Sequence, residues 1–385
     1  MPTSPSSPDI AMNLRRLRSA RALTQDALAQ RAGLSRAAYR NLEAGRSEPR
    51  ARTVLQLAAA LGVKPPELLR PAPPPPRARF RSRRRLKERE QLLVTVARQL
   101  EDYAELERLV DERGPYALGG LQPVVTDPER RPIVAARAVR QALGLTEAEP
   151  IRDICGLLEE RAGIKVLRLP VATDAFFGLA IADGDGGPAI VVNTWDRISV
   201  ERWIFTVAHE LGHLVLHETD FRSDQVEESA DSEREADIFA GHFLMPQALF
   251  DSEWEETRGL ALYDRVLKVK RIFRVSYRTV LYRLYEKGEL EIWARFQAEA
   301  RRRTGRTLLK TDEPAALQQE AFAWGSPEPR RAREPRELVP DDFVPDRRWR
   351  LVRRAIENGL ISLGRGAEIL GIPLRDMRQV AASWV

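Results

Sequence analysis

The sequence predicts a multidomain chain: an all-α N-terminal domain, an α+β domain with a small antiparallel sheet, and a helical C-terminal module. Three observations support this prediction. A length of 385 residues corresponds to two or three domains. Segments rich in proline and charged residues divide the chain at 71–89 and 326–345. Short β-rich segments gather between 165 and 193, and helical patterns flank them.

The composition is that of a globular protein. Its 43% hydrophobic content allows a sizeable core, and no apolar run approaches the length of a membrane span. The first residues are rich in serine and proline and lack the basic and apolar pattern of a signal peptide. The single cysteine, Cys155, has apolar neighbours, which indicates a buried structural thiol in a reducing compartment. We therefore expect a cytoplasmic protein that has no membrane partner.

The first domain is expected to span residues 10–70. Thr24 is a natural helix N-cap, and Ser35 can cap a second short helix from 36 to 43. A tight turn that contains Gly33 joins the two helices. Two short helices around a glycine turn, inside a small bundle, form a helix-turn-helix pattern.

One face of the second short helix has the composition of a DNA-contacting surface. Arg36, Tyr39 and Arg40 stand at positions i, i+3 and i+4, so they share this face. We expect all three to be exposed and able to enter a major groove.

A basic segment follows the first domain, and we predict a linker at 71–89. Between 77 and 89 there are eight basic residues and one acidic residue, Glu88. Such a segment can lie along phosphates or can be a solvated linker with no partner, and charge alone favours neither. A helical spacer is predicted at 90–131, where apolar residues recur at helical spacing and are compatible with a core stripe or with a homodimer interface.

The central domain is expected at 132–295. Helical patterns at 133–143 and 151–161 precede β-rich segments at 165–169, 178–182 and 189–193. A helix is then expected from 200 to 217. The resulting prediction is an antiparallel sheet packed on this helix.

That helix carries the motif His209-Glu210-x-x-His213. On a helix this spacing places both imidazoles on one face, about one turn apart, where they can bind one zinc ion. Glu210 then lies beside the open coordination position and is the candidate general base. The motif predicts a hydrolytic metal site.

A hydrolytic zinc site needs a third protein ligand. His217 lies eight residues beyond His209, about 12 Å along a continuous helix, and is too distant to share a metal with it. On the next helical segment Glu233 and Asp237 share a face, so one can bind zinc while the other orients a ligand histidine. Glu235 and His242 point elsewhere on that helix.

The stabilisation of the oxyanion requires a further group. Tyr263, Tyr277 and Tyr282 are candidates, and each is equally compatible with packing.

The N-terminal domain resembles the Cro/repressor-like (XRE) DNA-binding domains. The resemblance rests on Leu-Thr-Gln-Asp-Ala-Leu-Ala at 23–29, Leu-Ser at 34–35, Asn-Leu-Glu-Ala-Gly at 41–45 and Leu-Ala-Ala-Ala-Leu-Gly-Val at 57–63. It implies that Gln25 contacts a phosphate of double-stranded DNA and that Glu43 forms a structural ion pair. The residues that it implies for the recognition helix are Ser35, Arg36, Ala37, Tyr39 and Arg40.

The central domain resembles the ImmA/IrrE metallopeptidases. The motifs are Ile-Val-Val-Asn at 190–193, Phe-Thr-Val-Ala-His-Glu-Leu-Gly-His at 205–213, Glu-Arg-Glu-Ala-Asp-Ile-Phe-Ala at 233–240 and Phe-Leu-Met-Pro at 243–246. The resemblance implies a zincin-like fold with His209, His213 and Glu233 as ligands of Zn²⁺, or of Mn²⁺ in its place. It also implies Glu210 as the base, with Asp237 behind the ligands. Members cut helix-turn-helix repressors and so regulate stress, mobile-element or antiphage genes, and some respond to single-stranded DNA.

Two functional hypotheses follow. The first is a DNA-binding zinc metalloendopeptidase, acting in a stress or DNA-damage response, that cleaves a helix-turn-helix repressor in trans or in its own chain. The second is a non-proteolytic XRE-type regulator or antitoxin whose zinc domain is a sensor or a structural module. Glu210 favours the first, because a structural zinc site has no need of a base beside an open position.

The C-terminal module is predicted at 346–385 as a helical hairpin. The segment Gly-Arg-Gly-Ala-Glu-Ile-Leu-Gly-Ile-Pro at 364–373 resembles a helix-turn-helix element. A second DNA contact and a small packing module are both compatible with it.

Overall fold

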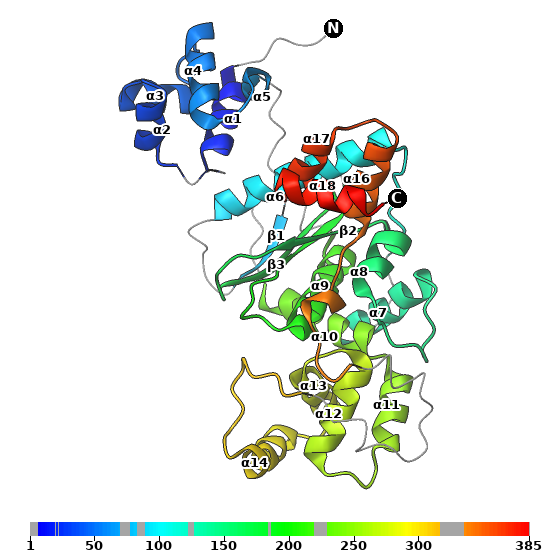
Figure 1. Ribbon diagram of the computed structural model, residues 1–385. Helices are drawn as coiled ribbons and strands as arrows, with labels where there is room; N and C mark the ends of the chain where they lie inside the picture. Colours follow the sequence, from blue (N-terminus) through cyan, green and yellow to red (C-terminus); the bar gives the residue numbers. More distant parts are fainter. Residues whose placement is uncertain are drawn as a thin grey trace. The chain divides into compact units, whose positions relative to one another are not determined.

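The computed structural model of the chain describes residues 7–19, 21, 23–69, 78–82, 89–121, 127–183, 186–218, 229–315 and 335–384 (Figure 1). The chain divides into two compact units. One comprises Met1–Pro76 with Leu86–Asp102, and the other comprises Arg77–Arg85 with Tyr103–Val385. Among the described helices, none has both the length and the apolar character needed to cross a membrane.

The first unit begins with a bundle of short helices. They are α1 (Ser7–Ser19), α2 (Gln25–Arg31), α3 (Arg36–Glu43), α4 (Ala51–Leu61) and α5 (Pro65–Leu69). Thr24 caps α2 by accepting a hydrogen bond of 3.1 Å from the Ala27 amide, and Ser35 caps α3 by accepting one of 3.2 Å from the Ala38 amide. Gly33, with φ of 65°, supplies the left-handed turn between these two helices. The predicted helix-turn-helix is therefore present.

The bundle is closed by apolar packing and by one ion pair. Leu14, Leu28 and Leu57 are fully buried in its core. The Arg18 guanidinium donates to both carboxylate oxygens of Glu43, at 2.8 and 2.7 Å, and so ties α1 to the end of α3. This is the ion-pair role of Glu43 that the XRE resemblance implies.

A long helix, α6 (Arg89–Leu109), follows within the predicted spacer. Val96, Leu100 and Leu106 on it are buried, in agreement with a core stripe. The second unit begins again at Tyr103, near the end of α6. Within this unit Tyr103 donates a hydrogen bond of 3.3 Å to Glu159 of η2 (Leu157–Ala162).

The second unit contains a four-stranded sheet with the order β1-β3-β4-β2. The strands are β1 (Ala78–Ser82), β2 (Lys165–Leu169), β3 (Phe176–Ile181) and β4 (Ala189–Asn193). β3 pairs antiparallel with both β1 and β4, but β2 pairs parallel with β4. The prediction of an antiparallel sheet is therefore wrong for this pair. β2 and β4 are buried along almost their whole length, as is usual for parallel strands covered on both faces.

The edge strand β1 lies within the segment 71–89, for which a linker was predicted. Its five residues pair with β3, so this part of the segment belongs to the sheet. Residues 70–77 and 83–88 lie outside the described part of the chain.

Helices cover the sheet. α9 (Val200–Leu216) packs on β3 and β4, and α10 (Ala230–Leu244) packs between α9 and α7 (Arg131–Ala142). The remaining elements are η1 (Pro128–Arg130), α8 (Ile154–Gly156), α11 (Gln247–Glu256), α12 (Leu262–Phe273), α13 (Tyr277–Glu286) and α14 (Ile292–Thr304). Cys155 is buried in the core that these elements form.

The C-terminal part comprises η5 (Pro340–Asp342), α16 (Arg347–Glu357), α17 (Leu363–Leu370) and α18 (Leu374–Ala382). Residues 335–345 belong to the second predicted linker, of which residues 326–334 lie outside the described part. Phe343 within it is buried and packs edge-on against the Trp203 ring of α9, with centroids 5.8 Å apart. This stretch is therefore a packed part of the second unit's core.

Candidate metal centre

Helix α9 carries the motif in the interior of the second unit. Ser199 caps the helix, and the chain then remains helical through His209, Glu210 and His213. These three side chains are almost completely buried, with exposures of 0%, 0% and 1%. Burial of three ionisable groups on one helix needs compensating partners.

Helix α10 supplies the first of these partners, and a glycine allows it to approach. A Cβ atom on Gly212 would lie 3.0 Å from Cδ1 of Phe239 and 3.3 Å from Cα of Ala236. Only a residue without a side chain lets the two helices come this close. The close approach brings Glu233, in the first turn of α10, next to the histidines of α9.

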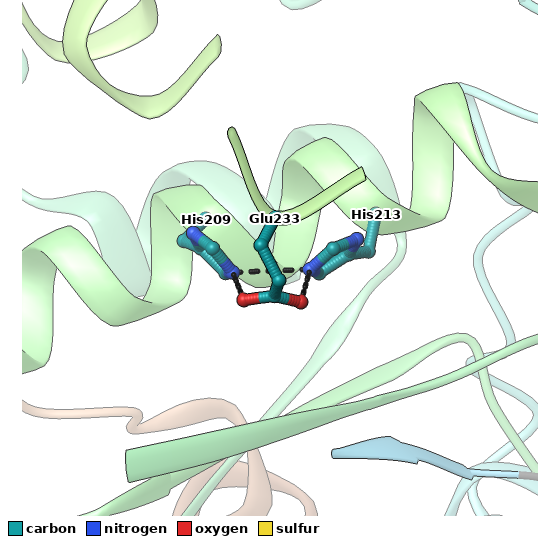
Figure 2. A group of neighbouring side chains, drawn as sticks. All are labelled: His209, His213 and Glu233. Carbon is teal, nitrogen blue, oxygen red and sulfur yellow. Dashed lines mark hydrogen bonds and ion pairs between the residues drawn. The ribbon is translucent and has the colours of Figure 1, made fainter. Parts of the chain in front are cut away.

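The three side chains direct one donor atom each to a common point (Figure 2). The two Nε2 atoms of His209 and His213 are 3.0 Å apart. Glu233 places one carboxylate oxygen 3.3 Å from the first and the other 3.1 Å from the second. In a tetrahedral zinc site with bonds of about 2.0–2.1 Å the ligand atoms are separated by roughly 3.3 Å. These separations are close to this value, so the three side chains lie near enough to one another to hold one zinc ion.

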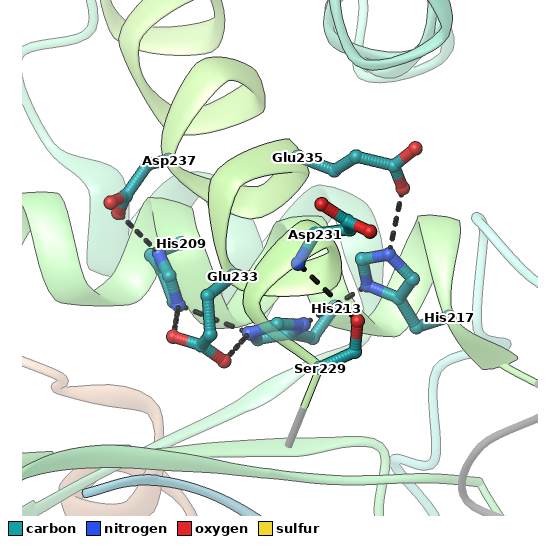
Figure 3. Close-up of polar contacts among 8 residues, drawn as sticks. All are labelled: His209, His213, His217, Ser229, Asp231, Glu233, Glu235 and Asp237. Atoms are coloured by element: carbon teal, nitrogen blue, oxygen red, sulfur yellow. Dashed lines mark hydrogen bonds and ion pairs between the residues drawn. The ribbon is translucent and has the colours of Figure 1, made fainter. Parts of the chain in front are cut away.

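The outer nitrogens of the two histidines fix which ring atom is free to bind a metal (Figure 3). Nδ1 of His209 lies 2.8 Å from the Asp237 carboxylate, so it carries the proton and Nε2 presents a lone pair. Nδ1 of His213 lies 3.0 Å from Nδ1 of His217, whose Nε2 is 2.9 Å from Glu235. Because Glu235 requires a proton on His217 Nε2, His217 accepts from His213. Both inner Nε2 atoms are then lone pairs that face each other, an arrangement that a cation stabilises.

The charge of Glu233 agrees with a cation site. Burial disfavours its ionised form, but its contacts with the imidazoles of His209 and His213 outweigh this and hold its pKa well below the usual carboxyl range. Glu233 is therefore an anion at neutral pH.

His217 has a role that the sequence did not reveal. It lies outside the donor triangle, as the helical spacing predicted, but it orients His213 and is itself held by Glu235. Arg131 completes this chain of contacts with an ion pair of 3.4 Å to Glu235. The signal was present in the spacing, since His217 follows His213 by four residues. His242 is elsewhere and pairs with Glu286 at 3.6 Å.

Glu210 lies between α9 and the sheet. A Cβ atom on Gly178 of β3 would lie 3.2 Å from Oε1 of Glu210 and 2.5 Å from Cγ2 of Thr206. The glycine thus permits the sheet to pass directly over this carboxylate. Of the tyrosines considered for the oxyanion, Tyr263 and Tyr277 both stack on Phe296, at centroid distances of 5.3 and 5.2 Å, and therefore serve packing.

The residues predicted to contact DNA divide into two groups. Ser35, Arg36, Ala37 and Arg40 are exposed on α3. Tyr39 is fully buried in the bundle core, so its predicted exposure is wrong. The Tyr39 ring packs into the apolar core of the bundle, and Arg40, the next residue, lies on the exposed face of α3.

Gln25 is partly buried, and its amide donates a hydrogen bond of 3.2 Å to Glu43. The phosphate contact of Gln25 stays a prediction.

Comparison with known families agrees with both domains. Residues 159–285 match the IrrE N-terminal-like domain family (Peptidase_M78), and residues 9–72 match a helix-turn-helix domain family. Searches of curated proteins and of solved structures found no significant match. The chain therefore contains a region similar to the IrrE N-terminal-like domain family behind a region similar to a helix-turn-helix domain family, in agreement with the resemblance to the ImmA/IrrE metallopeptidases.

Proposed function

We propose that this protein is a DNA-binding metalloendopeptidase that regulates transcription by hydrolysing a peptide bond in a helix-turn-helix repressor. The cue would be a stress such as DNA damage, and single-stranded DNA is the candidate activator. The observation that carries the proposal is the cluster of two buried imidazoles and the half-buried carboxylate of Glu233, with Glu210 on the same helix as the two histidines. The helix-turn-helix domain would bring the enzyme to DNA-bound substrate.

His209, His213 and Glu233 would hold the ion, and Asp237 and His217 would orient the two imidazoles. When bound, zinc supplies Lewis-acid chemistry and lowers the pKa of water towards neutrality. Glu210 is the base that takes the proton of the attacking water and then delivers it to the leaving amine.

The test is an incubation of purified protein with zinc or manganese, single-stranded DNA and helix-turn-helix repressors encoded near its gene. We expect wild type to cut a repressor and Glu210→Gln to leave it intact while retaining the metal. Glu253→Gln, which alters a buried carboxyl on α11 outside the site, is the matched control and should cut normally.

Two outcomes would decide against proteolysis. If wild type with bound metal cuts no repressor, and if the Glu210→Gln strain shows unchanged reporter output, the enzyme hypothesis is wrong. The non-proteolytic regulator or antitoxin, with the metal domain as sensor, would then describe the protein better.

A further inference from the structure

The sheet edge above the metal centre is covered by a segment from a distant part of the chain. β2, β3 and β4 all come from residues 165–193, and without β1 the strand β3 would be an edge strand. The covering residues, 78–82, come from the segment that connects the helix-turn-helix domain to the peptidase domain. An uncovered edge strand presents free amide and carbonyl groups and pairs readily with an extended peptide.

This edge passes over the proposed base. A Cβ added to Gly178 would lie only 3.2 Å from Oε1 of Glu210. In the register of the sheet Gly178 pairs with Arg81. Neighbouring strands lie about 4.8 Å apart, so the backbone at Arg81 runs one strand spacing from the residue that touches Glu210. Figure 2 shows the sheet, with β1 in blue, on the side of the site towards which the Glu233 carboxylate points.

The pairing is interrupted at this point. Arg81 pairs with Gly178 but Ser82 pairs with Phe176, so the register shifts between the two residues. A bulge of this kind disrupts the regular ladder and turns the backbone. The irregularity therefore begins at the residue that pairs with Gly178, which lies next to Glu210.

These features are those of a bound substrate strand. A peptide that a protease recognises by strand addition is extended, pairs with the sheet edge and brings one peptide unit to the catalytic groups. β1 is extended and antiparallel to β3. Because it is tethered to the domain, its effective concentration at the edge of β3 is in the millimolar range.

We infer that the peptidase domain has a substrate in its own chain: one of the two peptide bonds between Phe80 and Ser82, in the strand that covers the edge of β3. This inference rests on the proposed function and names one substrate for it. Water adds across the peptide bond, the C–N bond breaks, and the products are a new carboxylate on the N-terminal fragment and a new amine on the C-terminal fragment. The helix-turn-helix domain then has no covalent link to the metal domain.

The experiment uses full-length protein purified with a chelator and then given zinc, followed by intact-mass measurement over time. We expect two fragments whose junction lies within 80–82, and none for Glu210→Gln. A half-time that does not change on dilution shows cleavage within one molecule. The double variant Arg81→Pro/Ser82→Pro, which removes two amide protons from the strand, should be cut at least tenfold more slowly, whereas Arg81→Ala/Ser82→Ala should be cut normally.

A second measurement does not depend on turnover. In Glu210→Gln loaded with zinc, the amides of 78–82 should be protected from hydrogen exchange, and the proline variant should lose this protection. Unprotected amides would show that the strand does not occupy the edge and would overturn the inference.

The two proposals can fail separately. If the zinc-loaded wild type stays intact but cuts a repressor, then the self-substrate inference is wrong and the proposed function stands. Cleavage of a repressor only after the proline substitutions, without self-cleavage, would make β1 an inhibitory strand and would also refute the inference. If neither the chain nor any repressor is cut, both proposals fail.

Discussion

Substitution of His217, which binds no metal, should weaken metal binding more than loss of the carboxylate behind His209. His217→Phe leaves the Nδ1–H of His213 without an acceptor in a buried position, because the His217 side chain is only 7% exposed. An unsatisfied buried donor costs about 1–3 kcal/mol. The ring can avoid this cost by moving its proton to Nε2, but that atom then cannot bind the ion. Either way we expect a 10- to 100-fold weaker zinc affinity, the range typical of such orienting partners.

Asp237→Asn provides the comparison. Asn can still accept from His209 through its carbonyl oxygen, so only the charge of a 2.8 Å hydrogen bond is lost. The Asp237 side chain is 44% exposed, and solvent screens its charge, so we expect a loss of about 1 kcal/mol or less, roughly fivefold.

The assay is a competition titration of zinc against a chromophoric chelator at fixed pH, with thermal unfolding as a check on the fold. His242→Phe is the matched control, since it also replaces a buried histidine but one that pairs with Glu286 away from the site. If His217→Phe binds zinc as tightly as wild type, or if His242→Phe weakens binding equally, the assigned chain of hydrogen bonds is wrong.

Three further predictions concern packing, pH and DNA. Gly212→Ala should lower the free energy of unfolding by about 1–3 kcal/mol, because the added Cβ would lie 3.0 Å from the Phe239 ring. Gly241→Ala is the control and should not lower it, because its Cβ would lie 3.4 Å from Cδ of Arg283, an ordinary contact distance. Denaturant melts of the two variants make the comparison. Burial raises the pKa of Glu159 to about 7, above its ordinary 4.5, so its ionisation costs more in the folded state than in the unfolded state. The free energy of unfolding of wild type, relative to that of Glu159→Gln, should therefore fall by about 3 kcal/mol as the pH rises from 4.5 to 7. A difference that does not change with pH would contradict this. Arg36→Ala and Arg40→Ala should each weaken binding to duplex DNA. The loss should be about 1–3 kcal/mol if the arginine contacts a base, or the slope of log affinity against log salt concentration should fall by about one if it contacts a phosphate. Unchanged affinity at moderate salt would show that α3 is not the recognition helix.

The local elements could be predicted because their signals are local. Thr24 and Ser35 mark helix starts, and the strands at 165–169 and 189–193 have the predicted bounds. Helical spacing also pairs His209 with His213 and places Glu233 and Asp237 on one face, but the choice of Glu233 as the third ligand came from the family resemblance.

Long-range pairing could not be predicted in the same way. Nothing in the sequence of 78–82 indicates that it pairs with β3, because proline and arginine around it favour a linker. The parallel pairing of β2 with β4 depends on β3 lying on the other side of β4, which alternation within each strand does not encode. Tyr39 was assigned to the wrong face because a window of five residues fits both an exposed and a buried orientation, and only the rest of the bundle decides between them.

The contacts of Arg131 link metal occupancy to folding. Arg131 is the first residue of α7, and it donates a hydrogen bond of 2.6 Å to the carbonyl of Leu216 at the end of α9 in addition to its pair with Glu235. The ligand His213 is thus connected through His217, Glu235 and Arg131 to a third helix. An ion that binds only the native state stabilises that state, and with it the contacts that hold the ligands in place. An ion bound at this site would therefore act as a thermodynamic cross-link among α7, α9 and α10, and the concentration of free ion would set how firmly these three helices hold together.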